Sequence, residues 1–132
     1  MEAEPVNKME LTVLGLDEMD RTHEKFIQLV KKLRVATDAE FKALFHELHV
    51  HTEMHFAREF MRMKESNFPA LMEHHADHQR ILGELVHFGV RVGQGRLKMA
   101  RAFICEQLPD WFTTHLATMD SALVAHFRRG NV

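Results

Sequence analysis

The sequence predicts an all-α fold, an up-down-up-down antiparallel four-helix bundle preceded by an N-terminal arm. Apolar residues recur at alternating intervals of three and four along four long segments, the spacing of helices packed in a bundle. Turn-forming residues separate these segments, and the short connections favour antiparallel neighbours. No alternating pattern typical of a β-strand competes with the helical period. We expect one domain over residues 1–132, with the arm at 1–17 and the bundle at about 17–126.

The first two helices are predicted on either side of residue 37. The first runs from about Asp17 to Ala36, and its stripe consists of Met19, His23, Phe26, Val30 and Leu33. Thr37-x-x-Glu40 matches a capping box and opens the second helix. One face of that helix carries Phe41, Leu44, Phe45, Leu48, His55 and Glu59.

The last two helices follow clear breaks in the pattern. Asn67-Phe68-Pro69 interrupts the chain, and proline suits a first helical position. The third stripe consists of Leu71, His74, His78, Ile81, Leu85 and Phe88. After glycines at 89, 93 and 95, the fourth helix is expected from about Arg96 into the 120s, and Pro109 should kink it or interrupt its hydrogen bonds.

Composition excludes several classes of partner. The net charge of -2 gives no electrostatic reason to expect nucleic acid or an anionic membrane. No segment approaches the ~20 apolar residues of a membrane span, and the first residues lack the apolar run of a secretory signal. A single cysteine, Cys105, excludes an intramolecular disulfide and fits a reducing compartment, so we expect a cytoplasmic protein.

Seven potential metal ligands fall on the four predicted helices. They are His23, His55, Glu59, His74, His78, His115 and Asp120. Most of them occupy stripe positions that the same helices otherwise fill with Leu, Phe, Val and Ile. Burying these groups without partners would cost several kcal/mol each, a penalty that bound metal removes. Seven donors exceed what one ion usually takes, which indicates two ions side by side.

Asp120 fits this set less well than the other six residues. Five residues turn an α-helix by about 500°, which leaves His115 and Asp120 about 140° apart. A kink at Pro109, or a site lying beside the helix, could bring them together. The spacing alone does not decide whether Asp120 joins the site.

Donor chemistry limits the metal and the ligand. Imidazole and carboxylate without cysteine suit iron, manganese or zinc and disfavour iron–sulfur clusters and structural zinc. Two octahedral ions offer about twelve positions. Five histidines, two bridging carboxylates and one bridging oxygen would fill eleven and leave one for a small diatomic ligand.

At these residues the chain resembles the haemerythrins, particularly their bacterial branch. The similar segments run from Gly15 to His23, from His55 to Glu59, from Phe68 to His78 and from Trp111 to Asp120, and together they span about residues 15–122. The resemblance implies a non-haem centre of two Fe ions bridged by Glu59, Asp120 and an oxygen. It implies that His74, His78 and His115 hold one iron, that His23 and His55 hold the other, and that molecular oxygen binds at the remaining position.

Three positions differ from the bacterial pattern. His51 stands where a tyrosine is frequent, and Phe60 stands where a second glutamate is frequent. A tryptophan common in the arm is missing, and the chain has no tyrosine. These differences leave the ligands intact and bear on oxygen affinity, autoxidation and access to the pocket. His51 is the non-ligand histidine expected nearest the site, whereas His49-x-x-x-Glu53 is interpreted as an accidental, solvated pair.

Three functions follow as expectations. The first is reversible oxygen binding for carriage, storage or delivery, without enzymatic activity. It is favoured because five neutral imidazoles stabilise high-valent iron less than the glutamate-rich sites of di-iron enzymes do. The second is oxygen or redox sensing through an unidentified protein partner. The third is an oxidoreductase acting on peroxide or nitric oxide, which His51 and Phe60 leave open.

Overall fold

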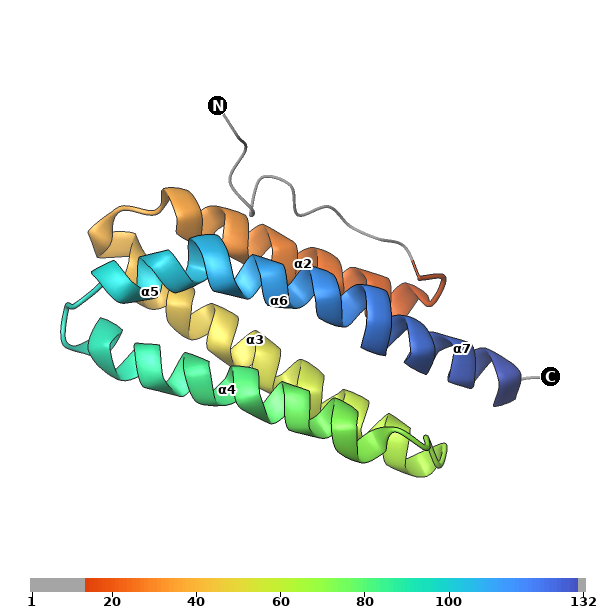
Figure 1. Cartoon of the computed structure of the whole chain (residues 1–132). Helices are drawn as coiled ribbons and strands as arrows, with labels where there is room; N and C mark the ends of the chain where they lie inside the picture. The colour runs from red at the N-terminus through yellow and green to blue at the C-terminus, as the bar shows by residue number, and fades with distance from the viewer. Residues whose placement is uncertain (1–13, 131–132) are drawn as a thin grey trace.

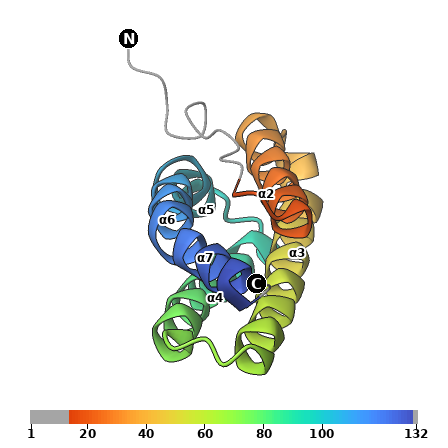
Figure 2. The ribbon, with the colours of Figure 1, turned by 90° about the vertical axis from the view of Figure 1, so that its right-hand side faces the viewer.

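The protein is an antiparallel four-helix bundle, as the sequence predicts. The computed structural model describes residues 14–130, and all regular secondary structure in this range is helical. Three helices, α2 (Asp17–Val35), α3 (Asp38–Glu65) and α4 (Leu71–Gly93), run up, down and up. The fourth rod returns along them, and an end-on view shows the four rods at the corners of a square (Figures 1 and 2). The predicted arm lies almost entirely outside the described residues.

The fourth rod consists of five consecutive helical pieces. They are α5 (Lys98–Ala102), the π-helix η1 (Phe103–Gln107), α6 (Leu108–His115), the π-helix η2 (Leu116–Asp120) and α7 (Ser121–Gly130). In η1 the N–H of Leu108 donates to the carbonyl of Phe103, five residues back. Pro109 lies just beyond and supplies no N–H, so the predicted interruption of the α-helical hydrogen bonds is confirmed there.

Local signals account for two of the helix starts. The capping box is confirmed, because Thr37 Oγ1 accepts from the N–H of Glu40 at 3.3 Å and Glu40 Oε1 accepts from the N–H of Thr37 at 2.9 Å. The prediction for Pro69 was wrong by two residues. α4 begins at Leu71, because Asn67 adopts a φ of 56° and the chain turns through Pro69 and Ala70 first.

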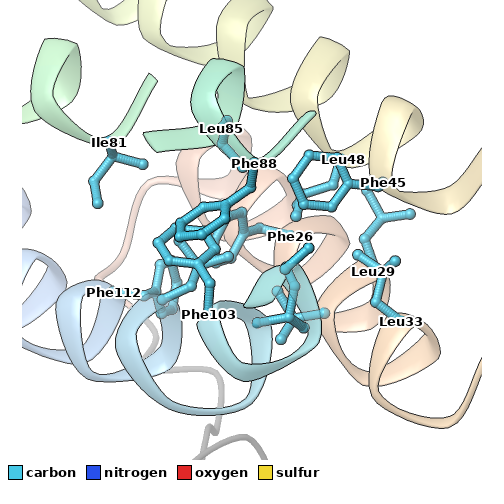
Figure 3. Packing of buried hydrophobic residues seen from close by; sticks show 14 of the residues in the cluster. Phe26, Leu29, Leu33, Phe45, Leu48, Ile81, Leu85, Phe88, Phe103 and Phe112 are labelled. Carbon is cyan, nitrogen blue, oxygen red and sulfur yellow. The ribbon is translucent and has the colours of Figure 1, made fainter. Parts of the chain in front are cut away.

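Two apolar clusters fill the bundle. The larger contains Leu33, Phe41, Leu48, Leu85 and Ile104, all at 0% exposure, together with the phenylalanines of Figure 3. The smaller cluster lies toward the opposite end and contains Met19, Met63, Phe68, Leu123 and Val124. On each rod the predicted ligands come in sequence between members of the two clusters. The polar residues therefore form one layer across the bundle, enclosed by apolar side chains at both ends.

Among residues 14–130, no helix combines the length and the apolar character needed to cross a bilayer.

Candidate metal centre

The seven predicted residues meet in the polar layer between the two apolar clusters. Six are at most 4% exposed, and His55 lies at the edge with 14% of its side chain exposed. One donor atom from each of five residues lies within 4.8 Å of the others, namely Glu59, His74, His78, His115 and Asp120. His23 and His55 lie against the outer side of the same two carboxylates.

Each carboxylate divides its two oxygens between the histidines on its two sides. Glu59 Oε1 lies 2.7 Å from His74 Nε2 and 3.5 Å from His78 Nε2, whereas Glu59 Oε2 lies 3.2 Å from His55 Nε2. The seven residues therefore form a three-histidine group (His74, His78 and His115) and a two-histidine group (His23 and His55), with the carboxylates between them.

Asp120 repeats this division. Its Oδ1 lies 3.1 Å from His115 Nε2 and 3.3 Å from His74 Nε2, on the side of the three-histidine group. Its Oδ2 lies 3.2 Å from His23 Nε2, on the side of the two-histidine group. Both carboxylates thus present one oxygen to each of the two histidine groups.

A π-helical turn brings Asp120 onto the face of His115. Within η2 the N–H of Ser121 donates to the carbonyl of Leu116, five residues back, and the Ser121 hydroxyl donates to the same carbonyl at 3.0 Å. Residues five apart face the same way in a π turn, whereas in an α-helix they diverge. The π turn, rather than a kink at Pro109 or a site beside the helix, therefore brings His115 and Asp120 onto the same face.

Many polar atoms in this layer have no hydrogen-bond partner of acceptable geometry among the described residues. They include both oxygens of Glu59, Oδ1 of Asp120 and Nε2 of both His23 and His74. These atoms approach one another closely, but they do not point along hydrogen-bond directions. Convergent, unsatisfied nitrogen and oxygen donors in an apolar interior fit metal ligation, which would use the lone pairs that hydrogen bonds leave free.

Burial and neighbouring charges set the protonation of these groups in the absence of metal. Desolvation, reinforced by nearby histidines, lowers the pKa of His55 to about 3 and that of His78 to about 2, so both rings are neutral and able to ligate. Burial also opposes the charge on His74, but its contacts with Asp120 and Glu59 prevail and raise its pKa to about 9. Burial raises the pKa of Glu59.

Aromatic side chains hold three of the imidazoles in place. The ring of Phe56 stacks on His78 with centroids 3.7 Å apart and planes only 2° from parallel. Trp111 stacks on His115 at 4.7 Å, and Phe112 meets His23 edge to face at 5.7 Å. Trp111 also lines a small cavity beside the two-histidine group.

Asp77 is a residue of the site that the sequence reasoning missed. Its Oδ2 accepts from His115 Nδ1 and from Trp111 Nε1, each at 2.8 Å. Because an ionised carboxylate only accepts, the proton of His115 is held on Nδ1, which leaves Nε2 free toward the centre. The hydrogen bonds from both donors also lower the pKa of Asp77, against the effect of its burial.

A small cavity lies against the two-histidine group. It is lined by both of these histidines, by His115 and Asp120, and by Phe26, Phe56, Trp111 and Phe112. Its volume is about 20 Å³, room for only a very small molecule. His51 also lines this cavity and donates from Nε2 to the carbonyl of Thr22 at 3.2 Å. By contrast, His49 lies 3.7 Å from the exposed Glu53, away from the centre, as expected.

Comparisons with known proteins agree with this geometry. The family model described as the Hemerythrin HHE cation binding domain matches residues 14–127. A protein named Bacteriohemerythrin, from Ralstonia nicotianae, is 32% identical over 107 residues, which cover 81% of this chain and 77% of that protein. No solved structure matches the chain.

Proposed function

Since this chain belongs to the hemerythrin HHE cation-binding family, we propose that it holds two iron ions and reversibly binds molecular oxygen beside its two-histidine group. The observation that carries the proposal is the unequal division of five histidines across two bridging carboxylates. Three imidazoles lie on one side and two on the other. The cavity is lined by both histidines of the smaller group and by one histidine, His115, of the larger.

The donor set fits iron. Imidazole nitrogens and carboxylate oxygens without a cysteine ligand suit iron, manganese or zinc, and we favour iron because reversible oxygen binding requires a redox-active metal. The three-histidine group would hold one ion and the two-histidine group the other, with Glu59 and Asp120 shared between them. When bound, the two irons would supply the electrons that make oxygen binding chemically reversible.

The cavity supports a diatomic ligand over a larger substrate. Its volume of about 20 Å³ is far below the roughly 300–1,000 Å³ typical of sites for organic ligands, and its surface is apolar. The group with one imidazole fewer contributes both of its rings to the cavity wall, so an ion held by His23 and His55 would have room for a further ligand on this side. The chain's residues thus confine a small apolar molecule next to the centre.

His51 favours binding over catalysis at this site. Burial lowers its pKa, so the ring is neutral at pH 7, and its Nε2–H is already committed to the carbonyl of Thr22. A neutral imidazole whose proton is engaged is a poor general acid for cleavage of an O–O bond. This supports a binding protein rather than a peroxidase.

Repeated cycles of vacuum and oxygen on the reduced, iron-loaded protein test the proposal. We expect oxygen uptake and release over several cycles, with one oxygen molecule bound per two irons. A visible charge-transfer band should appear on oxygen binding and disappear under vacuum. Irreversible oxidation on first exposure, with no bound state, would contradict oxygen carriage.

A further inference from the structure

A second apolar stripe runs along α4, on the side that faces away from the bundle core. Its members recur at alternating intervals of four and three residues, the spacing of a helix that packs against another helix. All of them are exposed, and Met72, Val86 and Val90 expose 72%, 53% and 59% of their surface. No acidic or basic residue interrupts this stripe, the α4 seam, which consists of Met72, Ala76, Gln79, Gly83, Val86 and Val90. Because the opposite stripe of α4 already packs in the bundle, the α4 seam is free to pack against a further helix.

The α4 seam is complementary to itself when two copies run antiparallel. With a two-fold axis level with Ile81, the seam residues pair across the axis as Met72 with Val90, Ala76 with Val86, and Gln79 with Gly83. In two of these three layers a longer side chain faces alanine or glycine, so the two surfaces interdigitate without crowding. Parallel pairing would instead place Gly83 against Gly83 and Met72 against Met72, which leaves a gap in one layer and crowds another. The residues of the α4 seam therefore favour a second copy in antiparallel orientation.

A groove beside the α4 seam fits its most exposed side chain. This groove lies between α3 and α4, has a volume of about 360 Å³ and is lined on the α4 side by Val86, Gly89 and Val90. Gly89 keeps it open, because a Cβ at this position would stand 3.6 Å from the ring of Phe45 and narrow the space. In the antiparallel register Met72 of the second copy lies opposite Val90, next to this groove. A long, flexible methionine side chain is well suited to fill such an irregular space.

The residues beside the α4 seam agree with the same register. On one flank Glu73 lies opposite His87 of the second copy, a pair that attracts when the imidazole is protonated. Arg80 comes near its own counterpart at the two-fold axis, and its ion pair with Asp77 at 3.4 Å offsets that repulsion. On the flank next to α3, the half-buried Leu82 meets its own counterpart, which adds an apolar contact at the axis.

We propose that two copies of this chain form a dimer through antiparallel packing of their α4 seams. The seam spans 18 residues, or about 27 Å of helix, and is one helix wide, so the interface lies at the low end of the range for specific dimers. We therefore expect a dissociation constant in the micromolar range. The cavity beside His23 and His55 is lined by α2, α3 and the fourth rod, so this dimer leaves it uncovered. The inference does not depend on which metal or ligand the centre holds.

Sedimentation velocity of the full chain over the micromolar range tests the proposal. We expect the wild type to shift from monomer to dimer as its concentration rises. Val86→Glu should raise the dissociation constant at least about tenfold, because its carboxylate would be buried against Ala76 of the second copy. Met54→Glu is the matched control, since Met54 is 54% exposed on the outer face of α3 and should leave the dimer unchanged. Circular dichroism establishes that both variants are folded.

Cross-linking tests the antiparallel register, in a Cys105→Ser background. Ala76→Cys and Val86→Cys chains should each remain uncrosslinked alone under mild oxidation with diamide, and should form disulfide-linked dimers when mixed. Cross-linking of each variant with itself would show parallel pairing and overturn the register. A wild type that stays monomeric would overturn the dimer and leave the α4 seam to a helix of another protein. A dimer that Val86→Glu leaves intact would place the interface elsewhere and equally contradict the proposal.

Discussion

The hydrogen bonds of Asp77 to His115 and Trp111 predict that this residue controls metal affinity without ligating metal. Both N–H donors lie 2.8 Å from one oxygen, and only 3% of the His115 side chain is exposed. Asp77→Ala leaves the N–H of His115 without its carboxylate and releases the ring from the orientation that aims Nε2 at the centre. Loss of such a partner typically lowers metal affinity about 10- to 100-fold, or about 1.4–2.7 kcal/mol.

Two further variants make this prediction specific. Asp77→Asn keeps an oxygen acceptor but removes the charge, so we expect the smaller loss, about tenfold. Asp38→Asn is the matched control, because Asp38 forms an exposed ion pair with Arg101 at 2.7 Å, away from the centre. Competition with a chelator for Fe(II) under anaerobic conditions gives the dissociation constants. If both Asp77 variants bound metal within about twofold of the wild type, the reasoning about His115 would be refuted.

Three other predictions concern protonation, stoichiometry and the core. The pKa of His74 is raised to about 9, so its ring carries a proton at pH 7 in the metal-free protein, and metal binding displaces that proton. This displacement should make the metal affinity rise about tenfold per pH unit up to about pH 9. Calorimetric titration in two buffers of different ionisation enthalpy measures the released proton, and a pH-independent affinity would count against it. His55→Ala removes half of the two-histidine group, so elemental analysis should find about one tightly held ion per chain, whereas two retained ions would contradict the division into groups. Leu85→Ala, at a position with 0% exposure in the larger cluster, should lower the free energy of unfolding by about 2–5 kcal/mol in urea denaturation without changing metal content. A parallel loss of metal would show that the core and the centre are coupled.

Periodicity and local capping were sufficient to predict the bundle. The stripe of α4 places His74, His78, Ile81 and Leu85 inward, and all four are buried in the structure. Thr37 forms its capping box as predicted, because both partners lie within one turn of the same helix. Apolar periodicity and helix caps involve residues close together in the chain, so they can be predicted from the sequence without knowledge of the rest of the fold.

Features that depend on an irregular backbone or on a second helix were not predictable in the same way. The π turn at η2 changes the direction in which the side chain of Asp120 points. A rule based on 3.6 residues per turn therefore places Asp120 on the wrong face of the helix. Asp77 precedes the ligand His78 by one residue, so helix geometry points it about 100° away from that ligand. Its partners, His115 and Trp111, belong to another rod, and only the packing of the bundle brings them together.

The cavity is a third feature that arises only from packing. His51 was expected near the site, and the structure adds the contact with Thr22 that holds its ring at the cavity wall. The walls come from α2, α3 and α6, so their chemistry is visible only in the folded molecule.

The buried layer of imidazoles and carboxylates is proposed to hold two cations. Anaerobic titration of the metal-free protein with Fe(II), followed by both bound iron and the thermal unfolding midpoint, tests this directly. We predict saturation at two irons per chain and an unfolding midpoint that rises as iron binds. The midpoint should rise because iron binds the converging, unsatisfied nitrogen and oxygen atoms that exist as a site only in the folded state. Saturation at one iron or none, or an unchanged midpoint, would contradict it.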